Sequence, residues 1–173
     1  MLFRSSGALT TSTAQPITVT ADSDGNLSGL LTVGGNITSN GGAVSLSGRG
    51  ITQSGGTVNA GAGTILVDAN DGAINMAGTL TTTNATTSAV RIIDSTTAAL
   101  GNINAVNGTV VLGQTTADER GGTNNLSGAV TQNTGTVLNV STLTGTAGST
   151  VVLGNANTVA RSEERRVGKE CRL

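Results

Sequence analysis

The sequence has almost no aromatic residues: among 173 residues there is one phenylalanine, Phe3, and no tryptophan or tyrosine. A globular core built around large aromatic side chains is therefore excluded. The chain has no histidine, and its only cysteine is Cys171. These absences exclude histidine-based catalysis, a disulfide within the chain and a cysteine–histidine zinc site. No apolar run reaches the ~18 residues that a membrane helix requires, so we expect no membrane span.

Charged residues are few and unevenly distributed. Between Ser6 and Ala160 there are three basic and seven acidic residues, which give a net charge of −4, and there is no lysine. Five of the nine basic residues lie in the last thirteen positions. The mildly acidic middle argues against nucleic acid as a partner, because phosphate binding requires a basic face.

The two ends of the chain differ from the middle. Residues 161–173 resemble the conceptual translation of a common short-read sequencing adapter, residue for residue through Arg172, with Leu173 in place of an expected serine. Residues 1–5 resemble the translated end of the opposite adapter. We therefore expect both ends to be adapter-derived, with the tail disordered or in a short helix, and residues 6–160 to form the repeat region. A solvated, charged interaction tail is the alternative for residues 161–173.

The middle of the chain repeats one short pattern. Runs of three or four mostly β-branched or aliphatic residues are bounded by Gly, Asn, Asp or Ser, which is typical of strands joined by turns. The runs lie at 17–19, 30–33, 44–46, 65–67, 90–93, 110–112, 137–140 and 151–153. Helix is disfavoured, because 26 of 173 residues are glycine and no segment keeps a 3.6-residue period.

The spacing of these runs predicts a solenoid. Val44 to Ile65 is 21 residues, Ile65 to Val90 is 25, and Val90 to Val110 is 20. Such a period is typical of a parallel β-helix, in which each short strand pairs with the equivalent strand of the next coil at ~4.8 Å. We expect a right-handed, all-β parallel solenoid of roughly seven coils without genuine caps, with small aliphatic side chains inside and Asn and Thr stacked in ladders.

One segment interrupts the rhythm. Gln114–Asn124 has a single apolar residue, Ala117, and three charges. The composition predicts a loop that projects from the rod. Loops of this kind are often functional on solenoids, and an insertion that is merely tolerated is the alternative.

The repeats at 21–29, 34–46, 50–58 and 108–113 carry a family resemblance. They resemble the repeat region of filamentous-haemagglutinin-like exoproteins of two-partner secretion and of large autotransporter adhesins. The resemblance implies a β-helical shaft, export across a Gram-negative outer membrane through a secretion pore, and a place at the extracellular cell surface. It also implies adhesion to a ligand on a host or neighbouring cell. We expect no enzyme activity, catalytic residue or cofactor in this segment.

Two other functions stay open, and each makes a demand on the residues. A β-helix polysaccharide lyase or hydrolase requires carboxylates and a base on one face, for which Arg91 and Asp94 are the candidate pair. A surface ion pair of little energetic value is the simpler interpretation of that pair. Tandem β-sandwiches, another type of secreted all-β passenger, would require longer alternating strands and a core aromatic.

A calcium-dependent β-roll is the last alternative. Asp22, Asp24 and Asn26 place oxygen ligands at alternate positions, as calcium loops do, but Leu27 stands where an EF-hand requires glycine. Asp68–Gly72 is a weaker candidate of the same kind. An Asx-rich turn explains both segments without a metal, so we expect no metal site.

Overall fold

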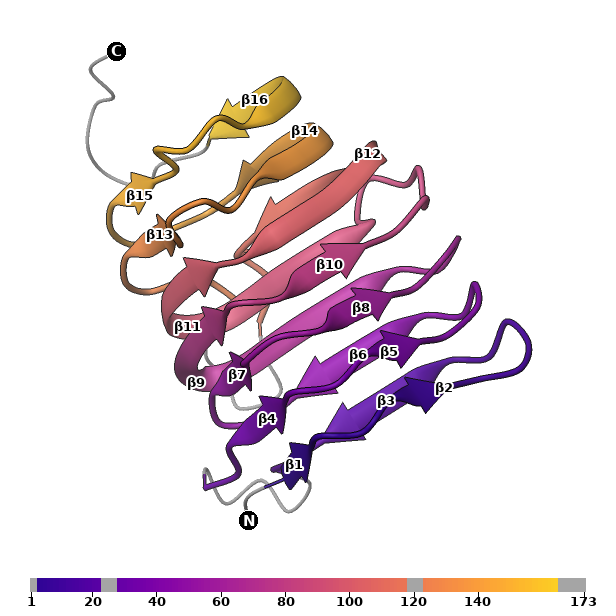
Figure 1. Cartoon of the computed structure of the whole chain (residues 1–173). Helices are drawn as coiled ribbons and strands as arrows, with labels where there is room; N and C mark the ends of the chain where they lie inside the picture. The colour runs from indigo at the N-terminus through magenta and orange to yellow at the C-terminus, as the bar shows by residue number, and fades with distance from the viewer. Residues whose placement is uncertain (1–2, 23–27, 118–122, 165–173) are drawn as a thin grey trace.

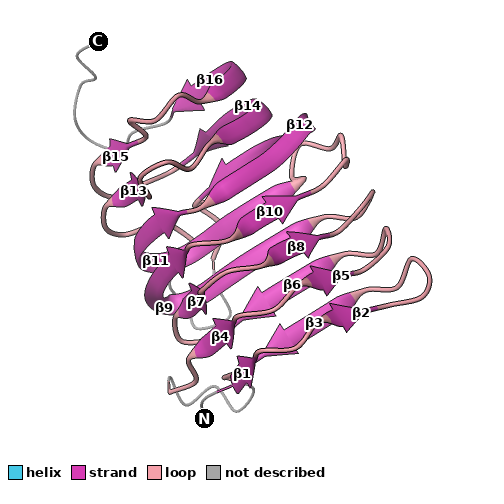
Figure 2. Ribbon diagram, viewed as in Figure 1, coloured by secondary structure: helices cyan, strands magenta, loops and turns pink. Residues whose placement is uncertain are grey.

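The chain is a parallel β-solenoid. The computed structural model describes residues 3–22, 28–117 and 123–164. These residues form sixteen strands and no helix (Figure 2), so none of them belongs to a helix that could cross a membrane. All pairings between the named strands are parallel, and the chain winds through about six turns (Figure 1). The predicted fold class is confirmed, with about six turns instead of seven.

Each turn contributes to three faces of the cylinder, here named A, B and C in the order in which the chain reaches them. Face A contains β1 (Phe3–Ser5), β4 (Leu31–Val33), β7 (Ile51–Gln53), the ends of β9 (Ile65–Met76) and β11 (Val90–Leu100), β13 (Val130–Gln132) and β15 (Val151–Val152). Face B contains β2 (Leu9–Thr10), β5 (Ile37–Thr38), β8 (Thr57–Asn59), β10 (Thr79–Thr81) and the beginnings of β12 (Asn102–Leu112), β14 (Leu138–Gly145) and β16 (Thr158–Glu164). Face C contains β3 (Ile17–Thr20), β6 (Val44–Ser47), the beginnings of β9 and β11, and the ends of β12, β14 and β16.

The core consists of aliphatic ladders that run along the axis. On face C, Val44, Ile65, Val90 and Val110 are direct register partners, and each is at most 1% exposed. These are the four residues whose spacing predicted the solenoid, so the predicted period is confirmed. Faces A and B carry equivalent ladders, Leu31–Ile51–Ile74–Ala98–Val130 and Ile37–Val58–Leu80–Ile103–Leu138. Each fully buried side chain of this size contributes about 1.5–3 kcal/mol of transfer free energy.

The longest connections between strands both lie at the corner where face C leads into face A. One connects β3 to β4 and the other connects β12 to β13. In the second, the main-chain N–H of Gln114 donates to the carbonyl of Asn124, and Ala117 and Thr123 form an antiparallel bridge. The predicted loop 114–124 therefore begins and ends as a hairpin stem, and residues 118–122 lie outside the described part.

Both ends of the described chain are in strands. β1 includes residues 3–5, and β16 crosses the predicted repeat boundary at Ala160 and runs to Glu164. The prediction of a helix or of disorder is wrong for residues 161–164 of the tail. These residues of β16 pair through their main chain with β14 as far as Gly145, and such pairing does not depend on the side chains. Residues 165–173 lie outside the described part.

Candidate functional site

Of the six charged side chains of the repeat region that the structure describes, five gather at one corner. In the described residues, Asp22, Arg49, Asp68, Asp71 and Asp94 all lie on the connections from face C to face A or at their first residue. They come from four successive turns, so they line one edge of the rod. Asp22, Asp68 and Asp94 are buried, whereas Arg49 and Asp71 reach the surface. This C–A corner is the strongest candidate for a site that uses charge.

The best-defined part of the corner is built around Arg49. Its guanidinium lies 3.6 Å from the Asp71 carboxylate, and its Nη1 donates to the main-chain carbonyl of Asn70 at 2.7 Å. The Asn70 side-chain amide donates to Ser47 Oγ at 3.2 Å, and the Asn70 N–H donates to Asp68 Oδ1 at 3.2 Å. Arg49 therefore holds one turn of the chain to the next, and its donors serve the backbone.

The corner bends the chain through conformations that few residues tolerate. Asn70, Asp71 and Asp94 have φ angles of 46°, 60° and 52°. Asn and Asp are the non-glycine residues that adopt this left-handed region most readily. The Asp68–Asn70 hydrogen bond is an Asx turn. The turn interpretation of Asp68–Gly72 is therefore confirmed, and the acidic residues here shape the backbone.

The structure does not bring together the candidate pair Arg91 and Asp94. The ion pair found within 4.0 Å in the described residues joins Arg49 to Asp71 instead. Arg91 lies in the middle of its strand, where its side chain is outward between Leu66 and Val111, and its buried Nε has no hydrogen-bond partner. Asp94 follows the strand at the bend. Side chains from a strand face and from a corner diverge, which separates the two.

The calcium candidate is only partly covered. Asp22 is buried at the end of face C, 5% exposed, whereas Asp24 and Asn26 lie outside the described residues. Among residues 3–22, 28–117 and 123–164, no group of three acidic, histidine or cysteine side chains is placed to hold a metal ion.

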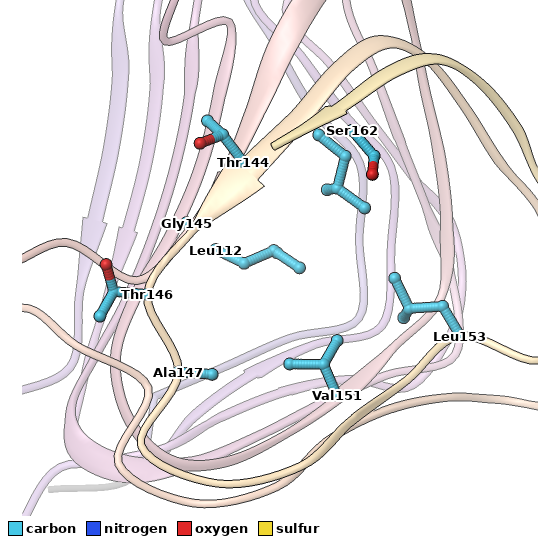
Figure 3. Close-up of a pocket in the computed structure, with 9 residues that line it drawn as sticks. Leu112, Thr144, Gly145, Thr146, Ala147, Val151, Leu153 and Ser162 are labelled. Carbon is cyan, nitrogen blue, oxygen red and sulfur yellow. The ribbon is translucent and has the colours of Figure 1, made fainter. Parts of the chain in front are cut away.

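A cavity of about 200 Å³ opens at the C-terminal end of the solenoid. Figure 3 shows Leu112, Val151 and Leu153 directed into the space that the last turns enclose. The cavity forms because the ladder of face C ends in small residues: Gly145 is the register partner of Leu112, and Ser162 is the partner of Leu143. Among the described residues, this end cavity is lined mostly by aliphatic side chains and by no carboxylate.

A second hollow of about 280 Å³ lies beside the hairpin insertion, between Gly113–Thr116 and Thr144–Thr146. Among the described residues, its lining consists of Val111 and of hydroxyl, amide and main-chain groups. It places the insertion close to the end cavity, which shares Thr144, Gly145 and Thr146 with it.

No protein-family model, curated protein or solved structure matches this chain. The function must therefore be inferred from the fold and its surfaces.

Sequence reasoning missed the convergence of charge at the C–A corner. The signal was present: Asp22, Arg49, Asp71 and Asp94 recur at intervals close to the coil length. In the linear sequence these residues are about one coil length apart, so no short motif contains two of them. Once the turns are stacked in register, one coil length returns each of them to the same edge.

Proposed function

We propose that this chain is a segment of the stalk, or passenger, of a large secreted bacterial surface adhesin. Its role is mechanical: stacked turns hold a distal binding region away from the cell. The observation that carries this proposal is the continuity of the three aliphatic ladders, whose buried residues are direct register partners in successive turns from β4 to β14. A solenoid whose turns share one continuous core transmits force and position along its axis.

The dimensions suit a spacer. Seven described strands on face C are separated by six steps of about 4.8 Å, which gives a rod segment of about 30 Å. Stability adds turn by turn in such solenoids, since each turn contacts only its neighbours. Further turns of the same kind would lengthen the rod without changing its cross-section.

The chemistry of the C–A corner supports a mechanical role over an enzymatic one. Arg49 is occupied by Asn70 and Asp71, and the carboxyl groups of Asp68 and Asp94 are buried at bends of the backbone. A lyase or hydrolase needs its acids and base exposed along a substrate groove. Neither cavity described above borders these side chains.

The proposal includes a place at the bacterial cell surface. The chain would cross the outer membrane through a secretion pore and contact a ligand on a host or neighbouring cell. Residues 6–160 contain no cysteine and no lysine. A chain with little charge and no disulfides to form can be exported unfolded and then fold by addition of one turn to the next.

The test is surface display of the full chain between an outer-membrane anchor and a small fluorescent domain. We expect the fluorescent domain to stand about 30 Å farther from the membrane than with a direct fusion, measured by energy transfer to a membrane dye. Ile92→Asp, inside the core, should remove most of this added height, because it buries an uncompensated charge. Leu66→Asp, on the outer side of the same face, should leave the height unchanged. Equal heights for the direct fusion and the intact chain would refute the spacer role.

A further inference from the structure

The outer surface of face B carries a regular grid of threonine and asparagine. Between Asn36 and Asn104 the strands read Asn-Ile-Thr, Thr-Val-Asn, Thr-Leu-Thr and Asn-Ile-Asn, and the central aliphatic residue of each is buried. The flanking side chains therefore project outward. The eight grid residues are Asn36, Thr38, Thr57, Asn59, Thr79, Thr81, Asn102 and Asn104.

The register places the grid residues in two straight columns. Thr57, Thr79 and Asn102 are direct partners in one column. Thr38, Asn59, Thr81 and Asn104 follow one another in the other, and Asn139, outside the grid, is the next partner of Asn104. Parallel strands repeat every ~4.8 Å along the axis, and residues two apart in a strand are about 6.6 Å apart. The outcome is a two-dimensional lattice of hydrogen-bonding groups on a rigid support.

The asparagines of the grid are held in fixed orientations. Asn36 Oδ1 accepts from the Thr57 N–H at 2.9 Å, and Asn59 Oδ1 accepts from the Gly61 N–H at 2.8 Å. Asn102 Oδ1 accepts from the Val137 N–H at 2.8 Å, and Asn104 Oδ1 accepts from Asn139 Nδ2 at 3.3 Å. In each case the oxygen is used and, within the described residues, the Nδ2 donors remain available to a ligand. A preorganised donor loses little entropy on binding.

The threonines supply rotatable groups that both donate and accept. None of the Thr38, Thr57, Thr79 and Thr81 hydroxyls forms a hydrogen bond with another group in the part of the chain that the structure describes. All four side chains are partly exposed. The grid therefore combines fixed donors with adaptable hydroxyls.

Charged residues and the two longest insertions lie away from face B. The face B strands from β2 to β14 contain no charged residue, and the charged C–A corner lies across the core from them. In Figure 1 the bends of β9 and β11 lie on one side of the molecule, and β5, β8 and β10 lie toward the other. The two longest insertions also leave from the C–A corner, so neither begins on face B.

These properties limit the class of ligand. Small molecules bind in concave sites, and neither cavity described above borders a grid residue. A face without Arg or Lys does not suit a polyanion, and one without Trp, Tyr or Arg lacks the usual anchors of protein interfaces. Sugar rings stack on aromatic side chains, which this face lacks. A periodic, uncharged solid that presents only hydrogen-bond donors and acceptors remains, and crystalline water has this chemistry.

We propose that the face B grid adsorbs to the surface of ice. The contact is a hydrogen-bonded match between two lattices, in which Asn Nδ2 groups donate to surface oxygens and Thr hydroxyls donate or accept as each oxygen requires. This function does not depend on the stalk proposal, because a grid on a free solenoid would adsorb equally well.

The test measures the fraction of purified full-length chain that partitions into slowly growing ice. Thr57→Lys/Thr79→Lys places two charges on paired positions of the grid. We expect its ice-bound fraction at low coverage to fall about tenfold, the factor that corresponds to 1.4 kcal/mol. Thr32→Lys/Thr52→Lys is the matched control, since these two threonines are paired on the outer side of face A. This control should partition like the unmodified chain.

A milder variant protects the test against misfolding. Asn104→Asp keeps the acceptor for Asn139 and replaces the Nδ2 donor at an exposed position, and its far-ultraviolet circular dichroism should match that of the unmodified chain. Its ice-bound fraction should fall as well. Exclusion of the unmodified chain from ice, an equal loss in the face A control, or retention on crystalline cellulose in place of ice would each overturn the proposal.

Discussion

At the scale of single residues, the corner between faces A and B depends on the absence of side chains. Gly35, Gly56, Gly78 and Gly101 stack in successive turns, and a Cβ on any of the last three would overlap the carbonyl oxygen of the glycine one turn before it. The turns approach so closely because main-chain hydrogen bonds join them: Thr79 N–H donates to the Gly56 carbonyl at 3.0 Å. The high glycine content of the chain is in part a requirement of this corner.

Gly101→Ala should therefore destabilise the solenoid by about 1–3 kcal/mol, the usual cost of forcing an added methyl group into a packed site. The clash is with main-chain oxygens of Gly78 and Met76, which cannot rotate away. Denaturant unfolding followed by circular dichroism measures the loss. Gly55→Ala is the control, because a Cβ at Gly55 meets nothing within 4 Å. Equal stabilities for the two variants would contradict this account of the corner.

Residue chemistry was predictable from the sequence where it is local. The Asx turn at Asp68 follows from residues two positions apart, and the structure confirms it. The pairing of Arg91 with Asp94 depended on whether a strand ends between them, which short-range patterns do not fix. Ile93 is the last residue paired with the preceding turn before the bend, and Asp94 adopts positive φ, so the two side chains leave in different directions.

At the scale of the element, aliphatic runs predicted most strands of face C and, on face A, β4 and β15. The runs at 17–19, 44–46 and 65–67 coincide with β3, β6 and the beginning of β9. Face B was harder to find, since β5, β8 and β10 each have one buried aliphatic residue flanked by Thr or Asn. Strands of this kind are stabilised by main-chain pairing with the turns before and after them. The few residues of one strand therefore do not predict it.

The last turn offers a prediction about packing. Ser162 stands in register with Leu143 and Val110, where the face C ladder requires an aliphatic side chain, and it borders the end cavity. Ser162→Val should fill part of the cavity and stabilise the chain by about 1 kcal/mol, which raises Tm by about 2–4 °C. Ala160→Val, at an exposed position of the same strand, should change Tm little. A lower Tm for the Ser162 variant than for the Ala160 variant would show that β16 is not in this register.

At the scale of the whole molecule, length and period together predicted the number of turns closely but not fully. The estimate of seven assumed an even coil of ~22 residues. On face A, register partners are 20 residues apart from Leu31 to Ile51 and 32 apart from Ala98 to Val130, because the hairpin insertion adds residues without adding a turn. The single charged corner was not predictable either, since it appears only when all turns are in register.

The two ends of the described solenoid present main-chain edges. Within the described residues, β15 and β16 pair on one side only, with earlier strands, whereas β1, β2 and β3 pair on one side only, with later strands. We expect the purified chain to associate end to end, with β1, β2 and β3 of one copy stacking on β15 and β16 of another. The unpaired main-chain N–H and C=O groups of the two edges can then pair as parallel strands. Sedimentation velocity should show larger species as concentration rises.

Leu153→Lys tests this association directly. Leu153 packs on the core in the last turn and lines the end cavity. A lysine at this position should shift the equilibrium toward the monomer, because its charge would have to be buried when two ends stack. Thr52→Lys, on the outer side of face A, is the control and should associate like the unmodified chain. A monodisperse, cooperatively melting monomer for the unmodified chain would count against association by its edges.

Both long insertions leave the rod at the same edge, and this has a consequence for how such a molecule changes over time. Residues can be gained, lost or exchanged between β3 and β4 or between β12 and β13 without moving a ladder residue. That edge is open to rapid diversification, while the other surfaces stay under the constraint of stacking. Sequence change along this one seam would leave the aliphatic ladders, and with them the cross-section of the rod, unchanged.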